Sequence, residues 1–139
     1  MGYRSDVSII IYGDDKDVTA FVASERLKGH EGVEYHPLDA PTSDKYHERF
    51  TWHTDDGDTM LEFNWFSFKW YESYPEVAYW EQLMSLFEQA FPSLHMEFVR
   101  IGEETADIVT NYFGNDPQYY MTAERTIYKD IPTQEKKHD

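Results

Sequence analysis

The sequence predicts an α+β fold in which one antiparallel sheet carries two helices on one of its faces. Runs of β-branched and aromatic residues alternate with two segments of helical periodicity, and an Asp-Gly turn joins two of these runs. The chain has 139 residues, of which 40% are hydrophobic and 17% aromatic. This composition is sufficient for one domain, expected over residues 1–131, followed by a polar tail at 132–139.

The first strand and helix are marked by residue type. Residues 6–12 are expected to form a buried central strand, because this largely β-branched run ends at a glycine. A helix over residues 15–28 should follow, with Asp14 and Asp15 as candidate N-caps and Gly29 as its stop.

The clearest local signal is a β-hairpin. Residues 30–45 contain two prolines and many small polar residues, so we expect a loop or a weak edge strand there. Residues 50–54 then alternate, residues 55–58 read Asp-Asp-Gly-Asp, and residues 59–71 return as a long strand. Asp-Gly between two alternating runs predicts a tight hairpin turn.

The second helix has both a start signal and an apolar stripe. Ser73 followed by Glu76 predicts a capping box, Pro75 suits the first turn, and Pro92 ends the helix. The stripe consists of Val77, Trp80, Met84, Phe87 and Phe91. Its spacing of three and four residues predicts a buried helix face.

Two further strands are expected over residues 94–101 and 108–112. A turn at residues 114–117 then predicts a final strand over 119–128, so that the chain ends in a β-hairpin. The full order is β-α-β-β-α-β plus a hairpin. Its first six elements match the split βαβ, ferredoxin-like arrangement.

The aromatic residues of the long second hairpin strand are expected to divide between the two sheet faces. Strict alternation places one set on each face: Leu61, Phe63 and Trp65 on one, and Phe66, Phe68 and Trp70 on the other. The helices cover only one face. The other face is therefore either covered by the C-terminal hairpin or open as a partner or homodimer interface.

The charge of the chain is strongly negative and unevenly placed. The formal net charge is −15, and between Phe50 and Glu124 fourteen carboxylates stand against only Lys69 and Arg100. Such a chain repels nucleic acid and attracts basic protein surfaces. Direct DNA or RNA binding is therefore not expected.

Several other classes are disfavoured by composition. Cysteine is absent, which excludes disulfides and thiol catalysis. No apolar run reaches the length of a membrane helix, and the N-terminus lacks a signal-peptide core. We therefore expect a cytoplasmic protein without membrane contact.

The acidic and aromatic residues predict a partner-binding surface rather than a catalytic site. The candidate residues are Glu62, Trp65, Trp70, Tyr71, Glu72, Tyr74, Glu76, Glu81 and Glu88. Tryptophan and tyrosine supply much of the binding energy of protein interfaces. Spaced carboxylates also resemble a phosphate track, so a DNA mimic is one form that this hypothesis takes.

No catalytic motif is present, and the sequence predicts neither enzymatic activity nor a cofactor. His53, Asp55, Asp56 and Asp58 are the weak candidates for a metal site, because imidazole and carboxylates bind divalent ions. The same aspartates are favourable turn residues, and a turn without metal is the preferred interpretation. A metal-dependent enzyme centred on this hairpin stays as an alternative.

Two short stretches resemble small, mostly uncharacterised proteins encoded by bacteriophages and prophages. These are the opening Met1-Gly2-Tyr3-Arg4-Ser5-Asp6-Val7 and the segment from Lys69 to Val77. The resemblance implies a phage accessory protein in the host cytoplasm. Such a protein would bind and inhibit a basic host protein, for example a nuclease or a DNA-binding defence complex. An immunity protein against a basic nuclease toxin uses the same physics and is the second alternative.

Overall fold

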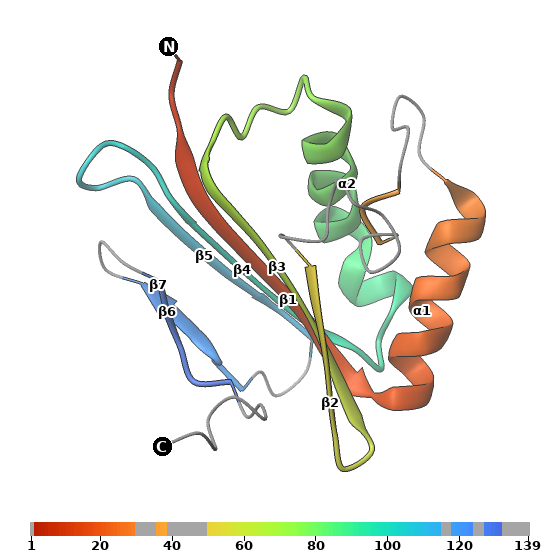
Figure 1. The fold of residues 1–139 in the computed structure, drawn as a ribbon. Helices are drawn as coiled ribbons and strands as arrows, with labels where there is room; N and C mark the ends of the chain where they lie inside the picture. The colour runs from red at the N-terminus through yellow and green to blue at the C-terminus, as the bar shows by residue number, and fades with distance from the viewer. Residues whose placement is uncertain (1, 30–35, 39–49, 115–117, 124–126, 132–139) are drawn as a thin grey trace.

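The computed structural model describes residues 2–29, 36–38, 50–114, 118–123 and 127–131 (Figure 1). Its elements are β1 (Ser5–Asp14), α1 (Asp15–Lys28), β2 (Phe50–Asp55), β3 (Asp58–Phe68), α2 (Pro75–Ala90), β4 (His95–Ile101), β5 (Ile108–Phe113), β6 (Met121–Ala123) and β7 (Ile127–Lys129). The predicted tail at 132–139 and most of the predicted loop at 30–45 lie outside the described residues.

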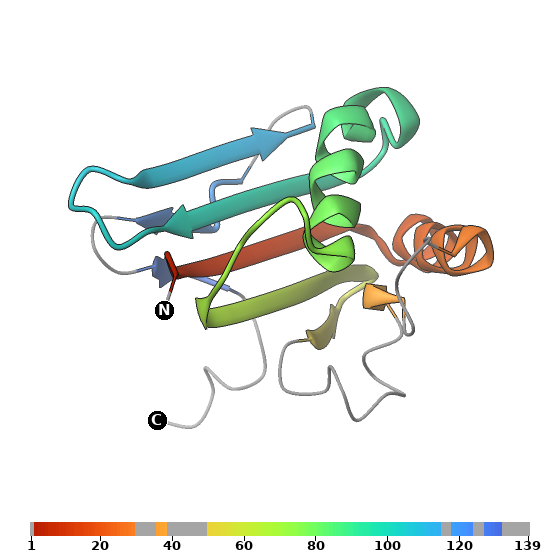
Figure 2. The same ribbon diagram turned by 90° about the horizontal axis from the view of Figure 1, so that it is seen from above.

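One five-stranded sheet forms the centre of the molecule. Its strand order is β2-β3-β1-β4-β5, and every neighbouring pair is antiparallel (Figure 2). Both helices lie on one face of this sheet, and β6 and β7 lie on the other (Figure 1). The predicted α+β class is therefore confirmed. The strand order differs from that of a four-stranded ferredoxin-like sheet, because β5 joins the edge beside β4.

The first strand is central and buried on both faces, as the β-branched run predicts. Ile9 and Ile11 point into the core beneath the helices, whereas Ile10 and Tyr12 belong to the cluster on the opposite face. Since successive side chains of a strand point to opposite sides, both faces of β1 must be covered by other elements.

The helices cover their face of the sheet with aromatic side chains. Trp80 and Phe87 of α2 are fully buried and pack with Phe21 of α1 in the same cluster. The buried carboxylate of Glu25 also joins the two helices, because it accepts a hydrogen bond from the hydroxyl of Tyr79 at 3.0 Å. Neither helix has the length and apolar character needed to cross a membrane.

The predicted hairpin is confirmed. Asp56 and Gly57 have φ angles of 52° and 87°, the left-handed backbone of a two-residue type I′ turn. The turn joins Asp55 to Asp58, which are paired across β2 and β3.

A β-bulge corrects the predicted division of the aromatic residues. Ser67 has a φ angle of 51°, and the register between β1 and β3 shifts at this point. Asp6 accepts the amide hydrogen of Ser67 at 2.9 Å, which fixes the bulge. Because the bulge adds one residue, Phe68 and Trp70 turn back toward the core under the helices, and Phe66 is left 73% exposed.

The C-terminal part of the chain also differs from the prediction. The strand expected over residues 119–128 is instead two short strands, β6 and β7, which pair with each other in a separate sheet. β5 pairs with β4 rather than with the segment that follows it. Met121 and Ile131 pack with Ile10 and Val99, so the C-terminal segment covers the sheet face that the helices leave open.

One buried acid attaches this C-terminal segment to the sheet. Glu97 of β4 is 0% exposed. Its two carboxylate oxygens accept the amide hydrogens of Tyr120 and Met121 at 3.1 and 3.0 Å and the hydroxyl of Tyr12 at 2.9 Å. A buried carboxylate of this kind is stable only when its hydrogen bonds are made.

The start of α2 corrects another prediction. The N-cap is Tyr74 rather than Ser73, Pro75 is in the first turn, and no side chain caps the helix. Glu76 therefore does not complete a capping box. Its carboxylate faces the sheet, where it accepts a hydrogen bond from the indole of Trp65 at 3.3 Å.

We expect Glu97→Ala to destabilise the protein by about 3 kcal/mol, because two buried donors and one partly buried donor lose their acceptor at once. Urea unfolding measures this loss. Amide hydrogen exchange should show the earliest loss of protection at Tyr120 and Met121. Glu97→Gln retains one carbonyl oxygen and should cost less, and an Ala variant as stable as the wild type would contradict the assigned role.

Candidate functional site

The two tryptophans of the predicted partner surface lie against α2. Trp65 is 2% exposed and Trp70 is partly buried. Their indole nitrogens donate hydrogen bonds to Glu76 at 3.3 Å and to Glu81 at 3.1 Å, respectively. These four side chains therefore attach α2 to the sheet, which corrects the expectation that the tryptophans form an exposed aromatic surface.

Three residues of the same set stay near the surface. Glu72 is exposed, Tyr74 is 37% exposed, and Tyr71 is half-buried. The Tyr71 hydroxyl accepts the amide hydrogen of Tyr3 at 2.7 Å, so it also fixes the start of β1. The rings of Tyr71 and Tyr74 lie 5.6 Å apart.

The last two glutamates of the set have internal partners on different sides of the molecule. Glu62 of β3 accepts hydrogen bonds from His53 at 3.0 Å and from Lys129 of β7, on the face opposite the helices. Glu88 of α2 accepts the amide hydrogen of Gly114 at 3.0 Å. The nine predicted residues therefore do not form one continuous acidic surface.

A different group of acids comes together at one end of the sheet. The acidic tip consists of Asp14 and Asp15, where β1 meets α1, and of Asp55, Asp56 and Asp58 at the β2–β3 turn. In the sheet register Asp58 is opposite both Asp14 and Asp55. The amide of Asp15 donates to the carbonyl of Gly57 at 2.8 Å, which fixes the two segments side by side.

In the acidic tip, side chains of like charge lie opposite one another. Asp14, Asp55, Asp56 and Asp58 are all exposed, and carboxylates directly opposite in a sheet destabilise it. The carboxylate of Asp15 supports the fold, because it accepts the Thr59 hydroxyl at 2.6 Å. Asp14 is the N-cap residue of α1, as predicted, but its side chain makes no capping hydrogen bond.

The structure also places the four weak metal candidates. His53 is turned toward Glu62, and its Nε2 lies 3.0 Å from a carboxylate oxygen of that residue. Asp55, Asp56 and Asp58 form the turn. Within the described parts of the chain, no group of three or more histidine or acidic side chains has the arrangement of a metal site.

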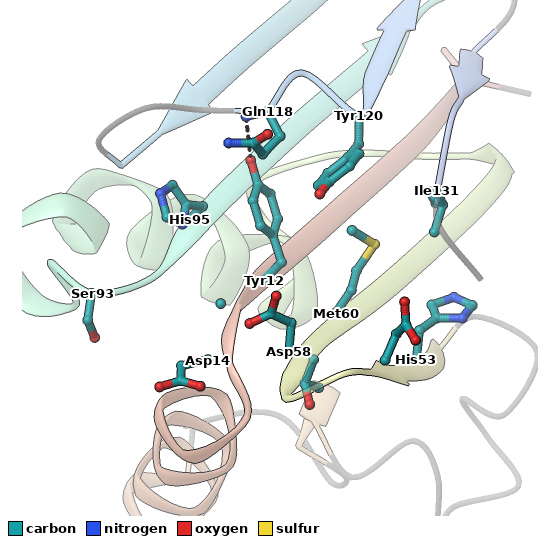
Figure 3. Close-up of a pocket in the computed structure, with 13 residues that line it drawn as sticks. Tyr12, Asp14, His53, Asp58, Met60, Ser93, His95, Gln118, Tyr120 and Ile131 are labelled. Atoms are coloured by element: carbon teal, nitrogen blue, oxygen red, sulfur yellow. Dashed lines mark hydrogen bonds between the residues drawn. The ribbon is translucent and has the colours of Figure 1, made fainter. Parts of the chain in front are cut away.

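A pocket of about 440 Å³ lies beside the acidic tip on the face opposite the helices (Figure 3). Its size is within the range of sites for small organic groups. Figure 3 shows Tyr12 and Tyr120 side by side, His95 and His53 at opposite sides, and Asp14 and Asp58 at the lower end. The described residues of its wall come from β1, β2, β3, the start of β4 and the C-terminal segment.

The aromatic wall of the pocket is held by ring packing and hydrogen bonds. The ring of Tyr12 stacks on His95, with centroids 5.0 Å apart and planes 10° apart, and meets the edge of Tyr120 at 5.0 Å. The Tyr12 hydroxyl donates to Glu97 and accepts the amide hydrogen of Gln118 at 3.0 Å. Burial raises the pKa of Tyr12, and the neighbouring Glu97 charge raises it further, so this phenol stays neutral.

The electrostatic environment of Tyr120 is also negative. Burial raises the pKa of its phenol first, followed by the charges of Glu97 and Asp58. The negative charge of Asp58 therefore contributes to the electrostatic field inside the pocket as well as to the charge of the acidic tip.

The sequence does not predict this pocket. It predicts a turn at the hairpin aspartates and a helix cap at Asp14, and it indicates no role for Tyr12, His95 or Tyr120. These residues come from separate strands and from the C-terminal segment, so no spacing in the sequence connects them. The available signal was the unusual pair of aspartates directly after a buried strand.

No protein-family model matches this chain, and comparisons with curated proteins and with solved structures found no match either.

We expect Asp58→Asn to stabilise the protein by a few tenths of a kcal/mol, because it removes the charge that opposes Asp14 and Asp55. Thermal unfolding at low salt measures the gain, which should shrink as added salt screens the repulsion. Glu72→Gln changes the net charge equally outside the tip and should have a smaller effect. A lower melting temperature for Asp58→Asn would contradict the repulsion.

The Glu62 network predicts a pH dependence. Burial tends to raise the pKa of Glu62, but the hydrogen bond and charge of Lys129, together with the bonds from His53 and Asn64, outweigh it and lower the pKa below 4.5. A lowered pKa stabilises the folded state above the unfolded-state pKa, and this stabilisation is lost as the pH falls through and below 4.5.

Lys129→Met should therefore destabilise the protein by about 1 kcal/mol at pH 7, and by progressively less below pH of about 4.5. Urea unfolding of both proteins across this range measures the difference. Lys69→Met, outside this network, should show no such convergence with the wild type. A difference for Lys129→Met that is independent of pH would exclude the ion pair as its cause.

Proposed function

We propose that this protein is a non-enzymatic binding module that attaches to a basic protein surface through its acidic tip. The observation that carries the proposal is the opposition of Asp14, Asp55 and Asp58 in the sheet register. Repulsion among these side chains weakens the free protein, and a cationic partner relieves it on binding.

The other predicted glutamates are less suited than the tip to bind a partner. Glu62, Glu76, Glu81 and Glu88 each accept an internal hydrogen bond, so their charge already serves the fold. At the tip, exposed carboxylates from two distant segments of the chain meet. Concentrated charge of one sign speeds association with an oppositely charged partner.

The nature of the partner follows from this charge. A basic surface large enough to match the tip is typical of proteins that handle nucleic acid, and the tip carboxylates then take the place of phosphates. Together with the resemblance to small phage-encoded proteins, this supports a host nuclease or DNA-binding defence protein as the target. Binding would inhibit the target by occupying its nucleic-acid site.

We also infer that the first six elements form a ferredoxin-like unit. Within the sheet, β2, β3, β1 and β4 are neighbours in that order and all antiparallel, with both helices on one face. β5 and the β6–β7 pair are then additions to this unit. The tip lies where β1 ends and β2 turns into β3.

If the partner binds at the tip, the charge of the tip should affect the binding affinity more than the total charge of the protein does. The variant Asp55→Asn, Asp56→Asn, Asp58→Asn should bind a labelled octa-arginine peptide at least about tenfold more weakly than the wild type at physiological salt. Asparagine is favourable in this turn, so the fold is retained. Fluorescence anisotropy measures the affinity.

The matched control is Glu72→Gln, Glu88→Gln, Glu103→Gln, which removes the same charge elsewhere. Glutamine still accepts the backbone hydrogen bonds that Glu88 and Glu103 receive. The control should bind within about twofold of the wild type. Equal losses for both triple variants would mean that net charge, and not the tip, attracts the peptide.

The natural target is then found by placing a photo-crosslinking amino acid at Asp56 or, as the control, at Glu72. A protein crosslinked from position 56 alone should be basic, and its purified form should lose affinity steeply with salt. A target that crosslinks equally from both positions, or whose binding is independent of salt, would contradict attachment through the tip.

A further inference from the structure

The pocket beside the acidic tip has the composition of a site for an organic cation. Three of its lining residues are the carboxylates Asp14, Asp55 and Asp58, and its described lining contains no lysine or arginine. None of these three carboxylates accepts a hydrogen bond from another described side chain in the structure. Their charge is therefore available to a group inside the pocket.

The aromatic wall adds a second kind of attraction. Tyr120 borders the pocket next to Tyr12, and its ring is held edge-on at 5.0 Å from the Tyr12 ring (Figure 3). Its backbone amide donates to Glu97, and its ring packs against Tyr12, so backbone and ring both have contacts in the free protein. The face of a tyrosine ring attracts a cation, and a flat cation stacks on it.

The wall between these groups is apolar. Met60 and Ile131 are each 7% exposed and line the pocket between the sheet and the C-terminal segment. Such a wall suits the methylene stem of a long basic side chain, whose charged end then reaches the carboxylates.

Among biological cations, guanidinium fits this arrangement best. It is flat, it stacks on aromatic rings, and its parallel N–H groups bind carboxylates in pairs, whereas an ammonium group is a strongly hydrated point charge. A metal ion is a poorer fit for this pocket, since no group of three suitable ligands is present among the described residues.

We propose that this pocket binds the guanidinium group of an arginine side chain that the basic partner presents. The inference rests on the proposed function, because it assigns the acidic tip's partner a specific anchor residue. Asp58 has two roles in it: its charge attracts the partner, and it binds the arginine once the side chain has entered.

The test is to titrate the protein with the peptide acetyl-Gly-Gly-Arg-Gly-Gly-amide and to monitor the backbone amides by two-dimensional NMR. We expect saturable shifts at His95, Gln118 and Tyr120, and none with the same peptide carrying neutral citrulline in place of arginine. The lysine peptide should bind several-fold more weakly. Absence of saturable shifts with the arginine peptide would overturn the proposal.

A matched pair of variants separates the pocket from the tip. Asp58 lines the pocket, whereas Asp56 belongs to the same turn without lining it. Asp58→Asn should weaken the arginine peptide about tenfold, and Asp56→Asn less than about twofold. Equal effects would mean that the arginine responds to the field of the tip and does not enter the pocket.

Two further outcomes keep the two proposals distinct. If octa-arginine binding depends on the tip but the single-arginine peptide does not bind, the proposed function stands and the pocket inference fails. If agmatine, a free guanidinium compound, binds the pocket while the arginine peptide does not, the site takes a free small molecule and the arginine anchor is overturned.

Discussion

One buried carboxylate holds residues 118–123 against the sheet. Glu97 is fully buried in the sheet and accepts hydrogen bonds from the backbone of Tyr120 and Met121 and from the Tyr12 hydroxyl. β6 and β7 have three residues each, and an isolated pair this short is barely stable in water. Their attachment through Glu97 closes the open face of the sheet. It also places Gln118 and Tyr120 over Tyr12, which creates the pocket. The cost of burying a charge is therefore offset by hydrogen bonds that define the shape of the site.

The other glutamates show how a very acidic chain uses its charge. Glu76 and Glu81 accept hydrogen bonds from two tryptophan indoles, and Glu25 accepts one from Tyr79 between the helices. Each bond satisfies a donor that an aromatic side chain brings into a partly or fully buried place. The acidic and aromatic content of this sequence are thus connected. The composition suggests a large acidic surface, but several of the carboxylates are internal hydrogen-bond acceptors. Among the described residues, one group of exposed carboxylates lies together at the acidic tip.

Elements determined by short-range spacing were predictable, and those determined by long-range contacts were not. The helix at Asp15–Lys28 and the Asp56–Gly57 turn follow from residue types within a few positions of each other. The bulge at Ser67 depends on Asp6, sixty-one residues away in the sequence, and it reverses the side of the sheet to which Phe68 and Trp70 belong. The pocket likewise requires Glu97 to bind the backbone of Tyr120. The sequence predicts an acidic turn at Asp55 and Asp58. The contribution of Asp14 to the acidic tip depends on the register of the sheet, which the sequence does not show.

Turn geometry alone does not explain the aspartates at the tip. Asparagine adopts the same left-handed backbone at position 56, and neutral residues at positions 14, 55 and 58 would pair without repulsion. The chain instead places opposed carboxylates at the end of β1, where their mutual repulsion works against the fold. The same three carboxylates border a pocket whose aromatic wall is held by ring packing and by the Tyr12–Glu97 hydrogen bond. A cation at this position lowers the repulsion among the carboxylates and binds without reorganisation of the site. The same group of charges therefore attracts the partner from a distance and binds its cation directly.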